Sequence, residues 1–351
     1  MEDKTHIVAP EVLRDLITQL YEKGGMSHGD ALFHAEGLVD ASLRGVDSHG
    51  VMRTGPYFTR IRNGAITVRP NIRQVGGDKA LAILDGDGAS GYIAAKRGME
   101  KAIELAREHH IGVAFVKNSN HFGPAALYAQ MAVEAGMVGF SATNVKPLIT
   151  APGAAGNVVG NNPFAVGIPT YNDFPFLLDL ALSVVAGGKL KMAVKKGERI
   201  PLDWAVDVDG NPTDDPQKGF DGYLLPVGGF KGLGMAYAID ILCGVLTGGA
   251  FQNHIKNMFK DPADPSETCH MLLAIDCGVM LGKEAIRERM AEYRDYIRSI
   301  PTTDGRPLCF PGEIEAGVKA RRLAEGIPVP HTVYQELKEL AQVNGLAVQL
   351  Q

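Results

Sequence analysis

The sequence predicts an α/β protein whose central part is framed by helices at both ends of the chain. Strand-like and helix-like patterns alternate between residues 80 and 143, as in layered α/β folds. Helical periodicity dominates the first 65 residues and returns in the last forty. The 351 residues are 45% hydrophobic and 21% charged, which is enough apolar material for a sizeable core and favours two domains.

The N-terminal part, residues 1–70, is expected to be helical. Pro10 opens a first helix, because proline fits the first helical position. Ser27 is the expected N-cap of a second helix, since its hydroxyl can accept a backbone N–H of the first turn. A loop at residues 44–50, Arg-Gly-Val-Asp-Ser-His-Gly, precedes a third helix over residues 51–62.

Residues 71–313 are predicted to form the α/β domain, and residues 314–351 to form C-terminal helices that pack against the N-terminal part. The expected strands are 80–84, 111–116, 137–143, 176–182 and 271–275, and the expected helices are 92–109, 124–135, 184–196, 228–246 and 283–300. The apolar helix at 228–246 and the strand at 176–182 are expected to be buried. A loop rich in glycine, proline and asparagine is predicted at 147–169.

Charge and composition exclude several classes of protein. The net charge is −5 and the pI about 6.1, so the basic footprint of a nucleic-acid-binding protein is missing. The basic cluster at 189–199 is interpreted as a solvated face. No apolar run reaches the roughly 18 residues of a membrane helix, and residues 1–5 lack an apolar signal core. The four cysteines show no metal-binding spacing, so we expect a cytoplasmic protein without a metal site.

Residues 86–91 read Gly-Asp-Gly-Ala-Ser-Gly, a literal match to the G-x-G-x-x-G pattern of dinucleotide-binding turns. The pattern lies between a predicted strand and a predicted helix, as that function requires. However, Asp85 and Asp87 would repel a phosphate, and the next strand ends in Lys117 and Asn118, without an acid for a ribose hydroxyl. A turn that only starts a helix is the favoured interpretation.

His49 is the first candidate for chemistry, with Ser48 before it and Arg53 after it. Histidine suits protonation of a forming alkoxide because its unperturbed pKa is about 6.5. Ser48 can orient the ring by a hydrogen bond, and Arg53 can grip a carboxylate with its planar guanidinium. From spacing alone, a loop histidine that caps the next helix is an equally good interpretation.

His121 is the second candidate, in the segment Asn-Ser-Asn-His-Phe-Gly at 118–123. This segment joins a predicted strand to a predicted helix. Ligands of α/β proteins collect at the carboxyl ends of strands, and a helix N-terminus suits an anion. Asp179 follows another apolar run and could bind a ribose or a nicotinamide amide. Capping of a turn or helix is the alternative role for both residues.

Together these segments resemble the type-2 malate/L-lactate dehydrogenases, also called the malate/L-sulfolactate/L-lactate dehydrogenase-like oxidoreductases. The matching motifs span nearly the whole chain in the family order: 44–53, 118–123, 143–144, 160–163, 178–183, 185–189, 229–232 and 310–313. The resemblance implies an α/β cofactor-binding domain that is not a Rossmann fold. It also implies NAD or NADP as cofactor and a homodimer.

The resemblance further implies roles for individual residues. His49 resembles the proton donor with Ser48 as its relay partner, and His121 is the alternative acid/base. Arg53 and Asn161 are the implied substrate contacts, although many members have threonine where Asn161 stands. The implied cofactor-binding residues are His121, Phe122, Gly123, Asp179, Leu180, Ala181, Gly187, Gly188, Pro311, Gly312 and Glu313.

The expected activity is that of an NAD(P)-dependent 2-hydroxy acid dehydrogenase (EC 1.1.1.-). It would transfer a hydride between the cofactor and a small 2-oxo or 2-hydroxy acid of the malate, lactate or sulfolactate type. Alternatives within the family are reduction of a diketo sugar acid, of a ureidoglycolate-type substrate or of a cyclic imine. Lys189 weakens the imine alternative, because the resemblance to imine-reducing members implies an aspartate at this position. A non-catalytic cofactor-binding protein and a metal-assisted hydrolase using His49 and His121 are the alternatives outside that chemistry.

Overall fold

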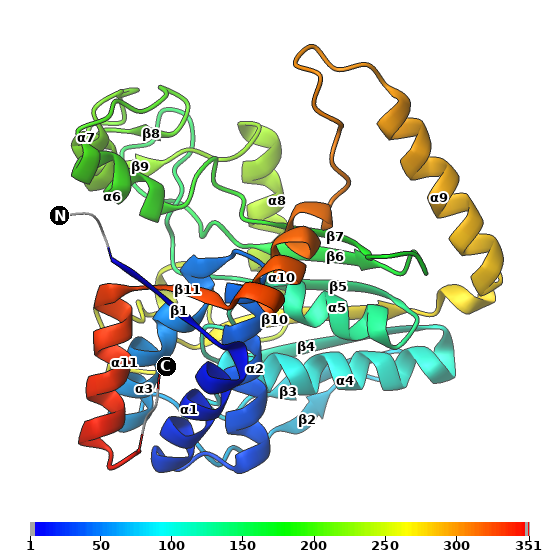
Figure 1. The fold of residues 1–351 in the computed structure, drawn as a ribbon, viewed down its shortest axis with the longest axis horizontal. Coiled ribbons are helices and arrows are strands. Elements are labelled where there is room, and N and C mark those ends of the chain that lie inside the picture. Colours follow the sequence, from blue (N-terminus) through cyan, green and yellow to red (C-terminus); the bar gives the residue numbers. More distant parts are fainter. Residues whose placement is uncertain (1–3, 348–349, 351) are drawn as a thin grey trace.

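The centre of the molecule is a seven-stranded sheet flanked by helices, which confirms the α/β class (Figure 1). The computed structural model describes residues 4–347 and 350. In their order across the sheet, the strands are β2 (Arg73–Gly76), β3 (Leu81–Asp85), β4 (Ile111–Ser119), β10 (Thr268–Ile275), β5 (Val138–Thr143), β6 (Phe164–Ile168) and β7 (Phe176–Leu180).

The direction of the strands decides where loops meet. β3 and β4 run parallel, whereas the other neighbouring pairs among the described strands are antiparallel. β10 lies between β4 and β5, so that Leu272 pairs with Ala114 on one side and Ser141 on the other. The carboxyl ends of β4 and β5 therefore lie at the same edge of the sheet as the start of β10. The loops at this edge build the candidate site.

The two faces of the sheet are covered by different helices. α4 (Gly91–His109) and α5 (Ala126–Glu134) pack on one face, and α8 (Phe230–Asp240) contributes to the apolar cluster of the other. Side chains alternate between the faces of a strand. In β10, Leu272 accordingly joins the cluster of α4 and α5, while Met271 packs against the cluster of α8.

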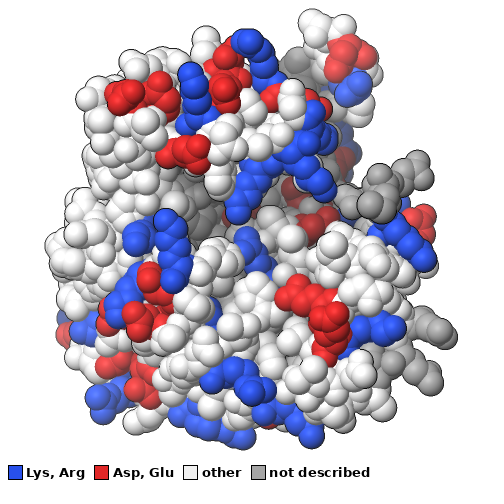
Figure 2. Space-filling view, turned by 90° about the vertical axis from the view of Figure 1, so that its left-hand side faces the viewer, with Lys and Arg blue, Asp and Glu red and all other residues white. Residues whose placement is uncertain are grey.

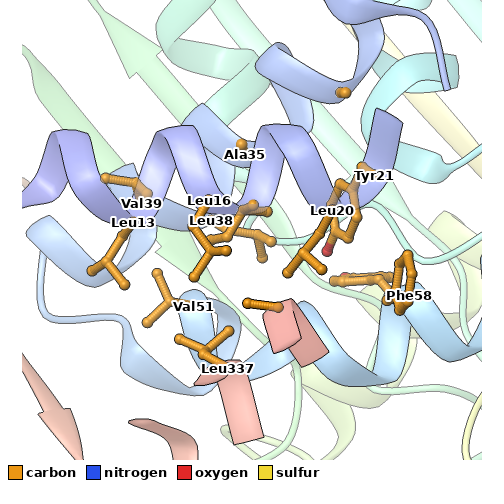
Figure 3. Packing of buried hydrophobic residues seen from close by; sticks show 14 of the residues in the cluster. Leu13, Leu16, Leu20, Tyr21, Ala35, Leu38, Val39, Val51, Phe58 and Leu337 are labelled. Atoms are coloured by element: carbon orange, nitrogen blue, oxygen red, sulfur yellow. The ribbon is translucent and has the colours of Figure 1, made fainter. Parts of the chain in front are cut away.

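Segments from both ends of the chain pack side by side. β1 (Thr5–Val8) pairs with β11 (Ile327–Pro330) in antiparallel register. Figure 3 shows Leu13, Val51 and Leu337 converging in one apolar cluster. Helices α1 (Pro10–Lys23), α2 (His28–Leu43), α3 (Thr54–Arg62) and α11 (His331–Val343) contribute side chains to it, and α10 (Glu313–Glu325) packs against α2. The Ser27 side chain accepts the Asp30 N–H at 3.2 Å, which confirms the predicted N-cap of α2.

Three sequence predictions were wrong in detail. Residues 164–168, expected in a loop, form β6, and residues 327–330, expected to be helical, form β11. The expected buried strand is β7, which lies at the edge of the sheet and leaves the Asp179 side chain exposed. Short apolar runs do not reveal by themselves whether a neighbouring strand is available to pair with them, which is the physical reason for these differences.

The helix expected at 228–246 is α8, followed by a π-helical turn over Ile241–Val245. It is not a buried helix. Phe230, Ile241 and Leu246 are 74%, 47% and 68% exposed. Leu233, Ala236 and Ile239 are buried, while Phe230, Met235 and Tyr237 are exposed, so only one face of the helix is covered, which the apolar composition alone could not reveal.

A small unit over residues 187–224 stands above the sheet in Figure 1. It contains α6 (Gly187–Lys196), α7 (Pro216–Asp221), β8 (Ala205–Val206) and β9 (Tyr223–Leu224). Figure 2 shows Lys and Arg side chains gathered on the upper part of the molecule, with Asp and Glu among them. Lys196 pairs with Glu198 at 3.9 Å and Arg199 with Asp214, so the basic cluster is a solvated face as predicted.

α9 (Lys283–Ser299) projects from the body of the molecule, and all of its residues are at least partly exposed (Figure 1). Its Tyr293 and Tyr296 are 60% and 68% exposed. Among the residues that the structure describes, none of the helices combines the length and apolar character that crossing a bilayer requires.

Candidate active site

Two adjoining cavities lie at the edge of the sheet where β4 and β5 end, and they share His49, Gly123, Pro163 and Ala181 in their walls. The first has a volume of about 270 Å³; we call it the basic cavity, because Arg53, Lys146 and Lys256 line it and none of its described lining residues is acidic. The second has a volume of about 230 Å³; we call it the acidic cavity, because Asp40, Asp179 and Glu315 line it beside Arg44.

His49 lies between the two cavities. It ends a short 3-10 turn, Asp47–His49, that follows α2. Its Nδ1 atom lies 3.0 Å from the Ser48 hydroxyl. Burial, with a smaller contribution from the nearby Arg53 charge, lowers the pKa of His49 to about 4. The imidazole is therefore neutral in the resting site at neutral pH.

Arg53 is held with its charge toward the basic cavity. Its Nε donates to the Ser48 carbonyl oxygen at 2.6 Å, and its guanidinium lies 5.1 Å from the centre of the Phe259 ring. Both contacts fix the plane of the guanidinium. The end nitrogens remain available for a carboxylate.

His121 lies opposite His49, and the two rings stack at 5.6 Å with an interplanar angle of 15°. The Nδ1 atom of His121 lies 2.5 Å from the Tyr57 hydroxyl and accepts the Gly123 N–H at 3.3 Å. Burial, together with the His49 and Arg53 charges, holds the pKa of His121 well below its usual value. The sequence analysis treated the two histidines as alternative acid/base groups or as a pair in a metal-assisted hydrolase; the structure places them in one site.

Phe122 and Gly123 form a rigid wall beside His121. The Phe122 ring stacks on His270 at 4.8 Å. His270 is fully buried and bridges the hydroxyls of Thr143 and Ser119, each at 2.8 Å. A Cβ atom at Gly123 would come within 2.1 Å of the Tyr92 hydroxyl, and its φ is +74°, so glycine is required there.

Asp179 belongs to the acidic cavity together with Leu180 and Ala181. Its carboxylate accepts the Ala126 N–H at 2.9 Å, at the start of α5. The side chain is open to the cavity, yet the surrounding protein desolvates it and raises its pKa to about 6. The capping role and a role in ligand binding are thus compatible, because a carboxylate has several acceptor positions.

The other predicted residues divide into two groups. Asn161 lines the basic cavity, and its backbone carbonyl accepts the Leu182 N–H at 2.8 Å. Gly187 and Gly188 follow Ala186, which lines the basic cavity, but they do not line either cavity themselves. The segment Pro311–Glu313 does not line either cavity, but it contacts a residue that does: the Pro311 carbonyl accepts the N–H of Leu177, which lines the acidic cavity.

Several residues of the site were not predicted from the sequence. They are Tyr57, Lys146, Lys256, Phe259 and Glu315. A signal existed for Tyr57, since it follows Arg53 by four residues in a predicted helix and such residues share one helix face. The others lie in loops or on a helix far away in the sequence, where no pattern marks them.

The G-x-G-x-x-G turn at residues 86–91 does not take part in the site. The N–H groups of Gly86 and Gly88 donate to the carbonyls of Lys117 and Asn118, each at 2.8 Å. These amides are therefore engaged with β4 instead of being free to hold a phosphate. The turn contributes to neither cavity.

Comparison with known proteins agrees with this site. A family model described as "Malate/L-lactate dehydrogenase" matches residues 8–338. The chain is 37% identical to a malate dehydrogenase of Pyrococcus horikoshii, over 98% of this chain and 97% of that one. It is 32% identical to a ureidoglycolate dehydrogenase (NAD(+)) of Escherichia coli K12, over 94% of each chain.

A solved structure shares the whole fold. The sulfolactate dehydrogenase from Methanocaldococcus jannaschii superposes with a TM-score of 0.92 at 34% identity, over 98% of each chain. The fold, the site and these similarities define an oxidoreductase of small hydroxy and oxo acids. The chain belongs to the malate/L-lactate dehydrogenase family.

Proposed function

We propose that this protein is an NAD(P)-dependent 2-hydroxy acid dehydrogenase. The observation that carries the proposal is the stacked pair of His49 and His121 between the basic cavity of Arg53 and the acidic cavity of Asp179. A reduced nicotinamide, when bound, supplies the hydride. The chain must add a proton donor and a cation that binds a carboxylate. His49 in the shared wall can supply the first, and Arg53 in the basic cavity the second.

The acidic cavity fits the nicotinamide end of the cofactor. Gly123 has no side chain, so the shared wall leaves room for the ring, and Asp179 offers acceptor oxygens for ribose hydroxyls or the nicotinamide amide. Leu180 and Ala181 line the same cavity, and His121 and Phe122 are proposed to contact the nicotinamide from the adjoining basic cavity. Gly187, Gly188, Pro311, Gly312 and Glu313 are proposed to hold the parts of the cofactor that extend beyond it.

In the basic cavity, Arg53 pairs with the carboxylate of the 2-oxo acid and Asn161 offers its amide. This fixes the carbonyl carbon toward the acidic cavity. Binding of the anionic substrate would let His49 take up a proton from solvent, and as hydride arrives at the carbon the His49 imidazolium would give this proton to the oxygen and return to its neutral form. His121 donates a hydrogen bond to the same oxygen, and the product is a 2-hydroxy acid. Ser48 holds His49 for this transfer. The reverse reaction uses the same groups.

The charges of the basic cavity favour a substrate with a second anionic group. Lys146 and Lys256 line it in addition to Arg53. Lys256 has a carboxylate partner, Asp264, at 3.5 Å, whereas Lys146 forms no ion pair among the described residues. Lys146 therefore remains to bind a distal carboxylate or sulfonate. Acids of the malate or sulfolactate type fit this arrangement better than lactate.

We also propose the finer organisation of the fold. Residues 71–313 form a cofactor-binding domain that differs from the Rossmann fold, which the antiparallel pairs of the sheet support. Residues 1–70 and 314–351 form one helical subdomain, and the pairing of β1 with β11 and the shared apolar cluster support it.

The protein is proposed to act as a homodimer in the cytoplasm. The exposed apolar side chains of α8 and the projecting α9 offer surfaces for a second copy. Its four cysteines are free thiols, as a reducing compartment requires. Light scattering should give twice the 37.5 kDa chain mass. The mass of a single chain would reject the dimer.

Turnover with a panel of oxo acids tests the proposed function. We expect oxidation of NADH or NADPH, followed by its absorbance, with oxaloacetate and sulfopyruvate, and at least about tenfold lower kcat/KM with pyruvate, since losing one buried ion pair costs that much. Lys146→Gln should remove this preference and leave pyruvate unaffected. Cofactor binding without turnover on any 2-oxo acid, diketo sugar acid, ureidoglycolate or cyclic imine would favour the non-catalytic alternative.

A further inference from the structure

A group of buried aromatic side chains lies behind His121 and faces away from both cavities. It contains Tyr57 of α3, Tyr92 of α4 and His34 of α2. The rings of Tyr57 and Tyr92 meet edge to face at 5.8 Å, and those of His34 and Tyr92 stack at 4.1 Å. The Tyr57 hydroxyl extends from this group to the Nδ1 atom of His121 at 2.5 Å. The group therefore touches the candidate catalytic pair through a polar contact.

The direction of this hydrogen bond follows from its neighbours. The Gly123 N–H points at the same Nδ1 atom, and a backbone N–H can only donate. An Nδ1 atom that carried a hydrogen would oppose it. Burial raises the pKa of the Tyr57 phenol, so the hydroxyl keeps its proton. The Nδ1 atom accordingly presents its lone pair, and Tyr57 is the donor.

A neutral imidazole carries one hydrogen, which must then sit on Nε2. His121 lines the basic cavity, and within the described part of the chain its Nε2 has no protein partner. The Nε2–H group is thus left for a ligand in the cavity. His49 differs, because its Nδ1 faces the Ser48 hydroxyl, which can donate or accept and so leaves the tautomer open.

We propose that Tyr57 is a positioning residue that fixes His121 in the Nε2–H tautomer and aims this N–H into the basic cavity. There it meets the carbonyl oxygen of the substrate and stabilises the negative charge that develops as hydride reaches the carbon. A neutral histidine N–H can polarise a carbonyl in this way. The identity of that oxygen rests on the proposed function, whereas the tautomer of His121 does not.

The tautomer can be measured without any substrate. In protein labelled with ¹⁵N-histidine, NMR should show His121 of the free enzyme with its hydrogen on Nε2, and His121→Asn identifies the signal. In Tyr57→Phe the Nδ1 atom loses the shorter of its two donor contacts and keeps only the Gly123 N–H, so the pKa of His121 should rise by about one unit, a tenfold gain in proton affinity. A hydrogen on Nδ1 in the wild type, or an unchanged pKa in Tyr57→Phe, would overturn the proposal.

Tyr21→Phe is the matched control. Its buried ring lies 4.7 Å from that of His34, and its hydroxyl donates to the Thr54 carbonyl at 3.4 Å instead of to Tyr57 or His121. This variant should leave the His121 signal and its pKa unchanged. If it shifts both as Tyr57→Phe does, the effect belongs to packing and the proposed positioning role is wrong.

Kinetics give the second measurement. Tyr57→Phe should lower kcat about 10- to 100-fold, because the donor is less well aligned, and should change KM less than about twofold. The acidic limb of its kcat/KM profile should move to higher pH, as the pKa of His121 rises. If Tyr57→Phe turns over and its pH profile is not shifted, the positioning role of Tyr57 is wrong while the proposed function stands. If His121 carries its hydrogen on Nε2 but the enzyme turns over no substrate of the panel, the proposed function is wrong while the tautomer assignment stands.

Discussion

Burial sets the protonation states of the individual residues in this site. His49 and His121 are neutral because desolvation lowers their pKa values. Asp179 is shifted in the opposite direction, to about 6, because desolvation disfavours its charged form as well. A neutral imidazole pair thus separates a cationic cavity from one whose main carboxylate titrates just below neutral pH.

The shifted pKa of Asp179 predicts a pH dependence of cofactor binding. Above pH 6 the carboxylate is ionised and accepts hydrogen bonds, and as the pH falls through 6 it gains a proton and loses that capacity. The cofactor Kd should therefore rise about tenfold between pH 8 and pH 5. Asp179→Asn should bind weakly at all pH values, with a flat profile. Titration of cofactor fluorescence measures both.

Asp221→Asn is the control for this titration, since Asp221 lies on α7, away from both cavities, and its carboxylate accepts a hydrogen bond from the Gln217 side chain at 2.8 Å. It should keep the full pH dependence of the wild type. A wild-type Kd that does not change between pH 5 and pH 8 would show that Asp179 does not contact the cofactor.

Local motifs made part of the site predictable at the residue level. Ser48, His49 and Arg53 lie within six consecutive positions, so their spacing alone brought them together. Asp179 was a candidate because it follows an apolar run, whereas Asn161 required the resemblance to a family. The bond from Tyr57 to His121 spans 64 positions and depends on how α3 packs against the loop that follows β4. No pattern in the sequence carries that information, because it arises only from the tertiary fold.

At the level of elements, helices with caps were predicted best. α1 begins at Pro10 and α2 follows Ser27, as expected from the chemistry of helix starts. The short strands β6 and β11 were missed, because four or five apolar residues become a strand only when a partner lies beside them. A helix forms its backbone hydrogen bonds within one segment, so its side-chain periodicity can be recognised in the sequence. A strand forms them with another strand, which can lie far away in the sequence.

The contact between α4 and the sheet gives a prediction at this level. A Cβ atom at Gly98 would lie 2.7 Å from Leu272 and 2.8 Å from Val116, both buried in the sheet. Gly98→Ala should lower the free energy of unfolding by about 1–3 kcal/mol, because the crowded helix must move away. Urea denaturation measures the change.

Gly317→Ala in α10 is the matched helix variant. A Cβ atom there would meet no described atom within 4 Å. It should raise the free energy of unfolding by about 0.5–1 kcal/mol, since alanine favours the helix over glycine. Equal effects of the two variants would mean that close packing of α4 is not what Gly98 provides.

For the whole molecule, two buried histidines predict acid sensitivity. His34 and His270 are fully buried, and burial lowers the pKa of each to about 3. The unfolded chain binds their protons near pH 6.5, so the stabilising contribution is present above that pH and is lost as the pH falls. As the pH falls from 6.5 to 5, each of the two histidines should lower the free energy of unfolding by about 2 kcal/mol.

His270→Gln tests this assignment, because glutamine keeps polar groups beside Thr143 and Ser119 but does not titrate. Its unfolding free energy should fall by about 2 kcal/mol less than that of the wild type between pH 6.5 and pH 5. An identical fall in both proteins would show that His270 does not contribute to acid unfolding.

We propose above all that a hydride passes directly from the bound nicotinamide to the carbonyl carbon of a 2-oxo acid held by Arg53. The most direct measurement uses NADH and NADPH dideuterated at C4 of the nicotinamide, with oxaloacetate and sulfopyruvate as substrates, and locates the label in the product by NMR. Direct hydride transfer predicts one deuterium on C2 of the 2-hydroxy acid. A product formed at the enzymatic rate without deuterium at C2 would contradict it.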